Sequence, residues 1–565
     1  MNKCLSGSFS GIKSIQKWSV YLPLFVGLFT TTTFTLSFPP FDSSQLIFIC
    51  FVPLSLWAMI GPQKSYLITC FLSGFASWSI LLSWFRHIGD FMEGWILSGY
   101  IAILLIASII SLLFTIWCYF LRKILLSVKN KNTWTRFTGI FAIAGLWVIL
   151  EWARTFLIFG FPWLPLAASQ WKNPLMLQPA AWLGCYGISF MIIIINLGLF
   201  FYLKHLFGSK KKGKIPFIKK LCPEFYLALS CVGGSFYLFT KELPGNQPKD
   251  LLFNACIVQP ATPQSVKWDP NEALNNWFHL EYLTKKAIRE NPHSNLLLWP
   301  ESATPTPLLG DDELKLVVEK LVQELSVPLI SGNMAIEDES DRIFNAVFVI
   351  DPDSGVQDSF YKKRKLVPFG EYVPMKWFPF VNKIFDTGWD FTAGNQANVL
   401  KVRLKELKEE EGTIKYPAYF SNVGPLVCYE DTFPGLSRDL VKNKADFLFV
   451  TTNNGWFGEE GAAFQHAAHS VLRAVENRRP VIRCGNAGWS GWIDEYGFIK
   501  DTFEKEGTIY EDGFKCFAVT RYMKFIDHTT FYTANGDCFV LFCLFFFIRA
   551  LRFKSKKVTQ LKNTP

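Results

Sequence analysis

The sequence is poor in charged residues and in histidine. Only 18% of its 565 residues are charged, and histidine occurs seven times. The histidines are dispersed, and no group of cysteine and histidine has the spacing of a zinc site, so we expect no metal and no cofactor. Internal repeats and low-complexity stretches are also missing, apart from lysine-rich loops.

Apolar residues make up 50% of the chain, and they gather in long runs. These runs lie within residues 20–240 and again near 534–550, whereas the stretch between has the composition of a soluble protein. About 20 apolar residues suffice to cross a bilayer core. The first run follows a basic leader without a small-residue cleavage site, which indicates an uncleaved anchor. We predict eight transmembrane helices, at Tyr21–Phe38, Gln45–Ile60, Tyr66–Phe85, Trp95–Phe120, Thr138–Phe159, Ala180–Leu203, Glu224–Thr240 and Ala534–Phe547.

Lysine and arginine are unevenly distributed over the connections between these runs. Both tails and the second, fourth and sixth loops contain them, whereas the other loops contain only Arg86 and Lys172. Because basic loops stay in the cytoplasm, both termini are predicted to be cytoplasmic and residues 242–530 to lie on the periplasmic side of the inner membrane. The net charge of +10 then reflects membrane orientation, and we expect no nucleic-acid partner. The predicted domains are a membrane domain with seven helices (1–241), an exported domain (242–530), and an eighth helix with a cytoplasmic tail (531–565).

Within residues 242–530, short apolar segments alternate with amphipathic ones. "LLFNACIVQ" (251–259) and "NLLLWPE" (295–301) are typical of buried strands, and "NEALNNWFHLEYLTKKAIRE" (271–290) is typical of an amphipathic helix. This alternation predicts an α/β sandwich.

Thirteen cysteines occur in the chain, most of them in or beside the apolar runs. Only Cys256, Cys428, Cys484 and Cys516 belong to the exported block. Their wide spacing does not indicate a disulfide framework, although an exported domain would tolerate one.

Three reactive side chains follow predicted strands. Glu301 comes after "LLLWP", Lys363 lies in "FYKKRKLVPFGEYVP", and Cys428 comes after "GPLV". Sites in α/β domains gather at such strand ends, although any one of these residues alone is more often ordinary. As a set they are more specific, because a carboxylate can take the proton of a thiol and a lysine can stabilise the oxyanion formed when the thiolate attacks a carbonyl. The backbone N–H of Tyr429 is a second candidate donor.

The order Glu, Lys, Cys resembles the nitrilase, or carbon–nitrogen hydrolase, superfamily. More narrowly, "WPESATP", "YKKRKLVPFGEYVP", "CYED" and "TTNNGWFG" resemble the apolipoprotein N-acyltransferase family. "FPPFD" after the first run and "EWARTFLIFGFPWLPLAASQW" around the fifth extend the resemblance to the apolar part. It implies a polytopic helical membrane domain with eight transmembrane helices and an inserted, exported nitrilase-like αββα sandwich.

The resemblance also implies roles for individual residues. Glu301 would be the general base, Lys363 the oxyanion-stabilising lysine and Cys428 the nucleophile. The register Tyr-x-Lys-x-x-Leu-Val-Pro selects Lys363 over Lys362 and Lys365. Residues expected to bind substrate or to support the triad are Glu371, Tyr429, Glu430, Trp268, Trp456 and Asn345.

The reaction implied by the resemblance has two steps. Cys428 would take an acyl chain from a membrane phospholipid as a thioester, and the α-amine of a diacylglyceryl-cysteine apolipoprotein would then accept it. Both substrates are lipids held in the bilayer, which accounts for the membrane helices. The turn that contains Trp456 would act as a lid, together with Trp268, that guides the acyl chain.

Alternatives remain open at this level. A membrane-tethered amidase would pass the acyl group to water, and a transporter with an exported binding domain would need polar residues along several spans. Trp268 and Trp456 could be interfacial anchors, and Glu430 could be a solvated turn acid. Glu151 and Arg154, in the fifth run, could be a mutually satisfied structural pair or part of a substrate path.

Overall fold

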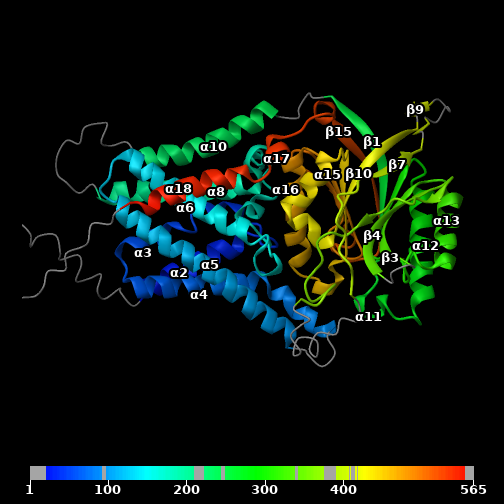
Figure 1. Cartoon of the computed structure of the whole chain (residues 1–565), viewed down its shortest axis with the longest axis horizontal. Coiled ribbons are helices and arrows are strands. Elements are labelled where there is room, and N and C mark those ends of the chain that lie inside the picture. Colours follow the sequence, from blue (N-terminus) through cyan, green and yellow to red (C-terminus); the bar gives the residue numbers. More distant parts are fainter. Residues whose placement is uncertain are drawn as a thin grey trace, which may run out of the picture.

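The computed structural model has a bundle of helices at one end and a two-sheet α/β domain at the other (Figure 1). The predicted basic tails and the sixth loop lie largely outside the described residues. The structure describes residues 21–91, 97–208, 222–242, 248–337, 342–374, 390–405, 407–408, 414–416 and 418–553.

Each predicted apolar run contains helix. The C-terminal helix α18 returns from the α/β domain to pack on α6 and α8 (Figure 1). The helices of the bundle are α2 (Tyr21–Leu36), α3 (Val52–Ile60), α4 (Gln63–Leu81), α5 (Ser98–Val128), α6 (Thr133–Ala153), α8 (Ala180–Gly208), α10 (Pro223–Glu242) and α18 (Cys538–Leu551).

Fewer helices than predicted have the length and composition of a membrane span. Among the described residues, Ser98–Val128, Thr133–Ala153 and Ala180–Phe207 qualify, and α4 with the segment that follows its 51° bend would make a fourth. The run Gln45–Ile60 is not one continuous helix, because a 3-10 segment, η1 (Ser44–Phe48), precedes α3, which has a proline in its first turn. The structure thus has a membrane-type helical region, and the number eight stays a prediction.

Two stacked sheets form the core of the α/β domain, and α12 (Ala273–Glu290) and α13 (Asp312–Leu325) cover the face away from the bundle (Figure 1). The first sheet has the order β15-β1-β2-β3-β4-β5 with β6 on β4, and the second has the order β14-β13-β12-β11-β10-β7. Strands β1, β2 and β3 run parallel, as do β10, β11 and β12. The predicted α/β sandwich is confirmed. Its strands are β1 (Lys249–Gln259), β2 (Leu296–Trp299), β3 (Leu329–Glu337), β4 (Arg342–Asp351), β5 (Gly355–Val356), β6 (Tyr361–Lys362), β7 (Leu400–Leu404), β10 (Tyr419–Val427), β11 (Phe447–Thr452), β12 (Val481–Gly485), β13 (Gly491–Ile493), β14 (Ile499–Thr502) and β15 (Gly513–Tyr522).

Helix α16 (Ala462–Asn477) lies between the second sheet and the bundle (Figure 1). It combines alanines and larger apolar residues with polar ones, and nearly all of its side chains are buried because the helix is covered on both sides. Gln465 joins the two halves: its Oε1 accepts hydrogen bonds from the indoles of Trp84 and Trp163, and its Nε2 donates to the carbonyls of Pro39 and Leu81. The α/β domain is therefore fixed to the bundle by a satisfied buried amide.

One pair of cysteines in the α/β domain forms a disulfide that the sequence did not indicate. A disulfide joins Cys256 of β1 to Cys516 of β15, which are register partners in adjacent antiparallel strands. The two lie 260 residues apart in the sequence, so their spacing gave no indication of the bond. Cys428 and Cys484 have free thiols.

Candidate active site

The three predicted reactive residues converge at the carboxyl ends of their strands. Glu301 follows β2, Lys363 follows β6, and Cys428 begins a short 3-10 turn, η5 (Cys428–Thr432), directly after β10. Nζ of Lys363 lies 3.6 Å from Oε1 of Glu301. Lys363 and Glu301 are buried, whereas Cys428 as a residue is partly exposed.

A second carboxylate and an amide hold the lysine in place. Nζ of Lys363 donates to Oε1 of Glu371 at 2.8 Å. Nδ2 of Asn345 donates to Oε1 of Glu301 and to Oε1 of Glu371, each at 2.8 Å. The backbone N–H of Lys363 donates to the carbonyl of Asn345. Asn345 and Glu371, expected to support the triad, thus form the frame that fixes the ammonium between two carboxylates.

The charges of this frame act on the lysine and on the thiol. Burial disfavours the charged form of Lys363, but Glu371 and Glu301 outweigh it and raise the pKa of Lys363 well above its ordinary value. Burial and the negative charge of Glu301 raise the pKa of the Cys428 thiol to about 12, although Lys363 acts in the opposite direction. Lys363 is therefore a permanent cation, and Cys428 rests as a thiol that would need a base in order to react as a thiolate.

The turn that carries the nucleophile is strained and supported from beneath. Cys428 has φ of 51°, in the left-handed region that residues with a side chain rarely occupy. Glu430 is fully buried, and its carboxylate accepts hydrogen bonds from the N–H groups of Val427 and Arg364 and from the hydroxyl of Tyr361. The hypothesis that Glu430 is a solvated acid in a turn is therefore wrong. Glu430 instead ties the nucleophile turn to the segment that carries Lys363.

Sequence reasoning missed a buried polar cluster behind the same turn. Nε2 of His466, on α16, lies 3.0 Å from the carbonyl oxygen of Cys428 and 2.8 Å from Oδ1 of Asp431. Ser470 and Arg483 both donate to Oδ2 of Asp431. Burial opposes ionisation of Asp431, but the charges of His466 and Arg483 hold its pKa well below its ordinary value. No motif marks His466 in the sequence, because only the packing of α16 brings it to the turn.

Tyr429 points toward the bundle. Its hydroxyl donates to the carbonyl of Gly160 at 2.9 Å, and its ring makes an edge-on contact with Phe433. The side chain thus anchors the nucleophile turn to the connection between α6 and α8.

The two predicted entrance tryptophans lie on adjoining turns. Trp268 ends the short helix α11 (Gln264–Lys267), and Trp456, 38% exposed, lies in the 3-10 turn η6 (Asn454–Phe457). Asn453 links these turns by donating to Oε1 of Gln264 at 2.9 Å.

The sequence analysis also did not identify Lys267, which precedes Trp268, as a residue of interest. Lys267 is buried, and burial lowers its pKa to about 8 although the charge of Glu301 opposes the shift. "SVKW" contains the lysine but gives no sign of its burial.

The turn predicted to be a lid is attached to the bundle at its far end. The ring of Phe457 lies 4.6 Å from that of Trp84 in an edge-on arrangement. The carboxylate of Glu460 contacts Arg86 and lies 3.1 Å from Nε2 of His87. Motion of the turn stays a prediction, and any opening would have to break these contacts or hinge beside them.

Among the described residues, no group of three or more histidine, cysteine, aspartate or glutamate side chains could hold a metal ion. The chemistry that Cys428, Glu301 and Lys363 can support is that of a thiol, a carboxylate and an ammonium: attack on a carbonyl, stabilisation of the oxyanion, and transfer of the acyl group.

Comparison with known proteins gives two family matches. Residues 31–198 match the apolipoprotein N-acyltransferase N-terminal domain, and residues 254–525 match the carbon–nitrogen hydrolase domain. An apolipoprotein N-acyltransferase of Geobacter metallireducens is 30% identical over 532 residues, covering 93% of this chain and 94% of the relative. One of Chlorobaculum tepidum is 25% identical over 570 residues, covering 96% and 97%, and one of Rhizobium rhizogenes is 28% identical over 490 residues, covering 82% and 84%.

Proposed function

This chain belongs to the apolipoprotein N-acyltransferase family, and from that membership we propose how its own residues carry out acyl transfer. The protein is an acyltransferase with a nitrilase-like α/β domain and an apolar helical domain associated with the membrane. Its proposed donor is a membrane phospholipid. Its proposed acceptor is the N-terminal α-amine of an apolipoprotein whose cysteine already carries a diacylglyceryl group.

In the first step, Cys428 attacks the ester carbonyl of the phospholipid. Glu301 takes the thiol proton as the sulfur–carbon bond forms, and the charge that develops on the carbonyl oxygen is stabilised by the ammonium of Lys363. The carbon–oxygen bond to glycerol then breaks, and Glu301 returns its proton to the leaving alkoxide. The products are an acyl thioester on Cys428 and a lysophospholipid.

In the second step, the α-amine of the apolipoprotein attacks the thioester carbonyl. Lys363 again stabilises the oxyanion, and Glu301 accepts a proton from the amine as the carbon–nitrogen bond forms. The carbon–sulfur bond breaks and the proton passes to the sulfur of Cys428. The enzyme is regenerated, and the apolipoprotein carries an amide-linked third acyl chain.

The observation that carries this assignment is the hydrogen-bonded frame of Asn345, Glu301, Glu371 and Lys363 beside a thiol on a strained turn. A fixed cation near a base and a nucleophile is what an oxyanion intermediate requires. Because the thiol pKa is about 12, the frame favours deprotonation during attack over a preformed thiolate.

Membrane topology and domain boundaries form part of the proposal. We place eight helices across the inner membrane, the catalytic domain (242–530) on the periplasmic side and both termini in the cytoplasm. The domain before it (1–241) then holds seven helices, and residues 531–565 hold the eighth helix and the tail. The uneven distribution of lysine and arginine supports this arrangement, and within the described residues three helices, or four with the bent pair, are long and apolar enough to span.

Access from the bilayer is proposed to pass the turns that carry Trp268 and Trp456. The link between these turns through Asn453 and Gln264 supports their acting together. The exposed indole of Trp456 suits the boundary between headgroups and acyl chains.

The proposed function is tested by incubating the purified full chain with acyl-labelled phospholipid and a diacylated lipopeptide. Amide-linked label on the lipopeptide is expected from the wild type and none from Cys428→Ala. Cys484→Ala is the matched control, because its thiol is also free but is enclosed, with its sulfur against the carbonyls of Val258 and Leu298. Release of free fatty acid with no labelled lipopeptide would instead support an amidase.

A further inference from the structure

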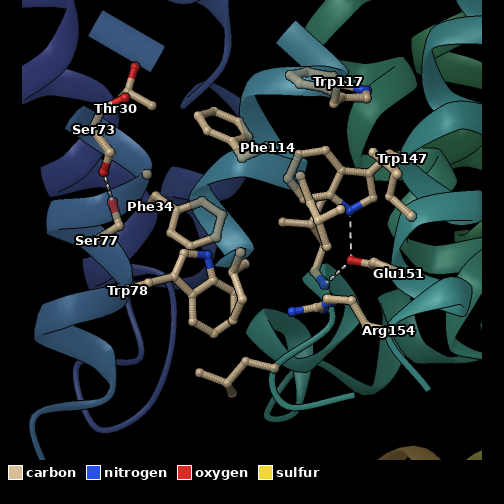
Figure 2. A pocket seen from close by; sticks show the side chains of 16 residues that line it. Thr30, Phe34, Ser73, Ser77, Trp78, Phe114, Trp117, Trp147, Glu151 and Arg154 are labelled. Carbon is tan, nitrogen blue, oxygen red and sulfur yellow. Dashed lines mark hydrogen bonds between the residues drawn. The ribbon is translucent and has the colours of Figure 1, made fainter. Parts of the chain in front are cut away.

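Buried polar side chains lie on both sides of the nucleophile turn, η5. On the bundle side, Glu151 near the end of α6 accepts hydrogen bonds from the indole of Trp147 and from the N–H of Leu166 (Figure 2). These contacts fix the end of α6, and none of them is with Cys428. On the side of α16, by contrast, the side chain of His466 contacts the backbone of Cys428 directly.

The imidazole of His466 is enclosed and held on both edges. His466 is 2% exposed, and its ring lies 5.6 Å from that of Trp163. Nε2 lies 3.0 Å from the carbonyl oxygen of Cys428 and 2.8 Å from Oδ1 of Asp431. Nδ1, on the other edge, lies 3.3 Å from Nδ2 of Asn454. Because Asn454 belongs to η6, the ring lies between the nucleophile turn and the turn at the proposed entrance.

These distances decide which ring nitrogen carries a hydrogen. Nε2 faces two oxygen acceptors, so it must be a donor. Among the described residues, Oδ1 of Asp431 has no hydrogen-bond partner, so the hydrogen on Nε2 points at the carbonyl of Cys428. The carboxylate of Asp431 acts on the ring through its charge, at 2.8 Å.

The carbonyl that accepts this hydrogen belongs to the same peptide as the N–H of Tyr429. A peptide is planar and nearly always trans, so its C=O and N–H point in opposite directions. A donor fixed on the carbonyl therefore sets the direction of the N–H, and it also polarises the peptide, because connected hydrogen bonds strengthen one another. Such support is needed here, since Cys428 has φ of 51°, a conformation that persists only when its surroundings hold it.

We propose that His466 is a positioning residue for acyl transfer, whose Nε2–H fixes and polarises the Cys428–Tyr429 peptide so that the N–H of Tyr429 joins Lys363 as a donor to the oxyanion. The contact of His466 is with the backbone of Cys428, so it acts through the peptide. The inference rests on the proposed function in one respect: an oxyanion must form when Cys428 attacks a carbonyl.

The test compares two reactions of the same thiol in the full chain. Acylation of Cys428 by 4-nitrophenyl butyrate passes through an oxyanion, and the release of 4-nitrophenolate, less that from Cys428→Ala, reports its rate. Alkylation by iodoacetamide displaces iodide from a saturated carbon and forms no oxyanion. A loss confined to acylation therefore reports on the oxyanion donors. Because the ester is soluble, failure of the wild type to use phospholipid would contradict the proposed function alone.

Two variants of His466 separate the donor from the rest of the ring. His466→Asn can still meet Asn454 but is too short to reach the carbonyl of Cys428, whereas His466→Gln places an amide N–H near the position of Nε2. Acylation of His466→Asn is expected to be slower by about tenfold, because complete loss of an oxyanion donor costs roughly 10²–10³-fold and here the donor is only misplaced. Its alkylation rate should match that of the wild type, and His466→Gln should recover most of the acylation rate.

His469→Asn is the matched control. His469 lies one turn further along α16, is buried and also packs on Trp163, at 5.5 Å, but its Nε2 accepts from the N–H of Leu164. Both rates should be unchanged in this variant. Normal acylation in His466→Asn, an equal loss in His466→Gln, a parallel loss of alkylation, or the same selective loss in His469→Asn would each overturn the proposal.

Discussion

The hydroxyl of Tyr429 donates a hydrogen bond to the carbonyl oxygen of Gly160 at 2.9 Å. The residue after Cys428 is thereby fixed to the helical bundle, although the two partners lie 269 residues apart in the chain. This contact couples the position of the thiol to the part of the protein that meets the lipid.

Removing that hydroxyl tests the coupling. Tyr429→Phe keeps the ring against Phe433 and loses one hydrogen bond, so lipopeptide acylation is expected to fall by about tenfold. Tyr66→Phe is a matched control, because it removes a comparable tyrosine bond, to the carbonyl of Cys118, inside the bundle. Equal loss of activity in both variants would mean that only stability had changed.

The base is tested by Glu301→Gln, which keeps the shape of the side chain and removes its basicity. Turnover is expected to fall on the order of 10²–10⁴-fold, a typical loss for a general base. Glu337→Gln is the control, because Glu337 pairs with the neighbouring Lys362 outside the triad and should be almost without effect. Near-normal turnover in Glu301→Gln would remove it from the mechanism.

The raised thiol pKa predicts a distinctive pH dependence of alkylation. With a pKa of about 12, only about one Cys428 thiol in 10⁴ is ionised at pH 8, and this fraction rises tenfold with each pH unit. The iodoacetamide labelling rate of Cys428, followed on its peptide by mass spectrometry, should therefore climb from pH 7 to pH 10 without levelling. The same peptide in guanidinium-unfolded protein should level near pH 9. A plateau near pH 8 in the folded protein would contradict the assigned electrostatics.

The bond between Cys256 and Cys516 should contribute to stability. It connects β1 to β15 across 260 residues of sequence, and removing a native disulfide commonly costs about 2–5 kcal/mol. The paired variant Cys256→Ala with Cys516→Ala should unfold at a lower temperature, whereas Cys484→Ala tests removal of an unpaired buried thiol. Alkylation of Cys256 and Cys516 in unreduced, unfolded protein would show that the bond does not form.

The meeting of Glu301, Lys363 and Cys428 could be predicted because each residue follows the end of a strand within a sequence motif that resembles a known family. Glu301 and Cys428 each come where an apolar strand stops, and Lys363 follows the short strand β6. The strands before Glu301 and Cys428 belong to different sheets, which meet face to face. What the sequence could not indicate is the approach of His466 to the carbonyl of Cys428, since that depends on how α16 packs beneath the sheet.

Other differences between the predicted and the observed structure also have local causes. Cys256 and Cys516 meet only because β1 and β15 pair in one register, which their positions in the sequence do not reveal. Hydropathy located the apolar helices but not their lengths: α2 ends at Leu36, shortly before the prolines of "FPPFD", and α3 begins afresh at a proline-containing turn. The eight predicted apolar runs therefore outnumber the helices that are long enough to span among the residues that the structure describes.

The central claim is that Cys428 carries the acyl chain, and its most direct test is to incubate the full chain with acyl-labelled phospholipid and no acceptor. The account predicts a labelled adduct on Cys428 that neutral hydroxylamine releases, that a diacylated lipopeptide discharges as an amide, and that is missing from Cys428→Ala. An adduct mapped to another cysteine, or amide formation in Cys428→Ala, would contradict it.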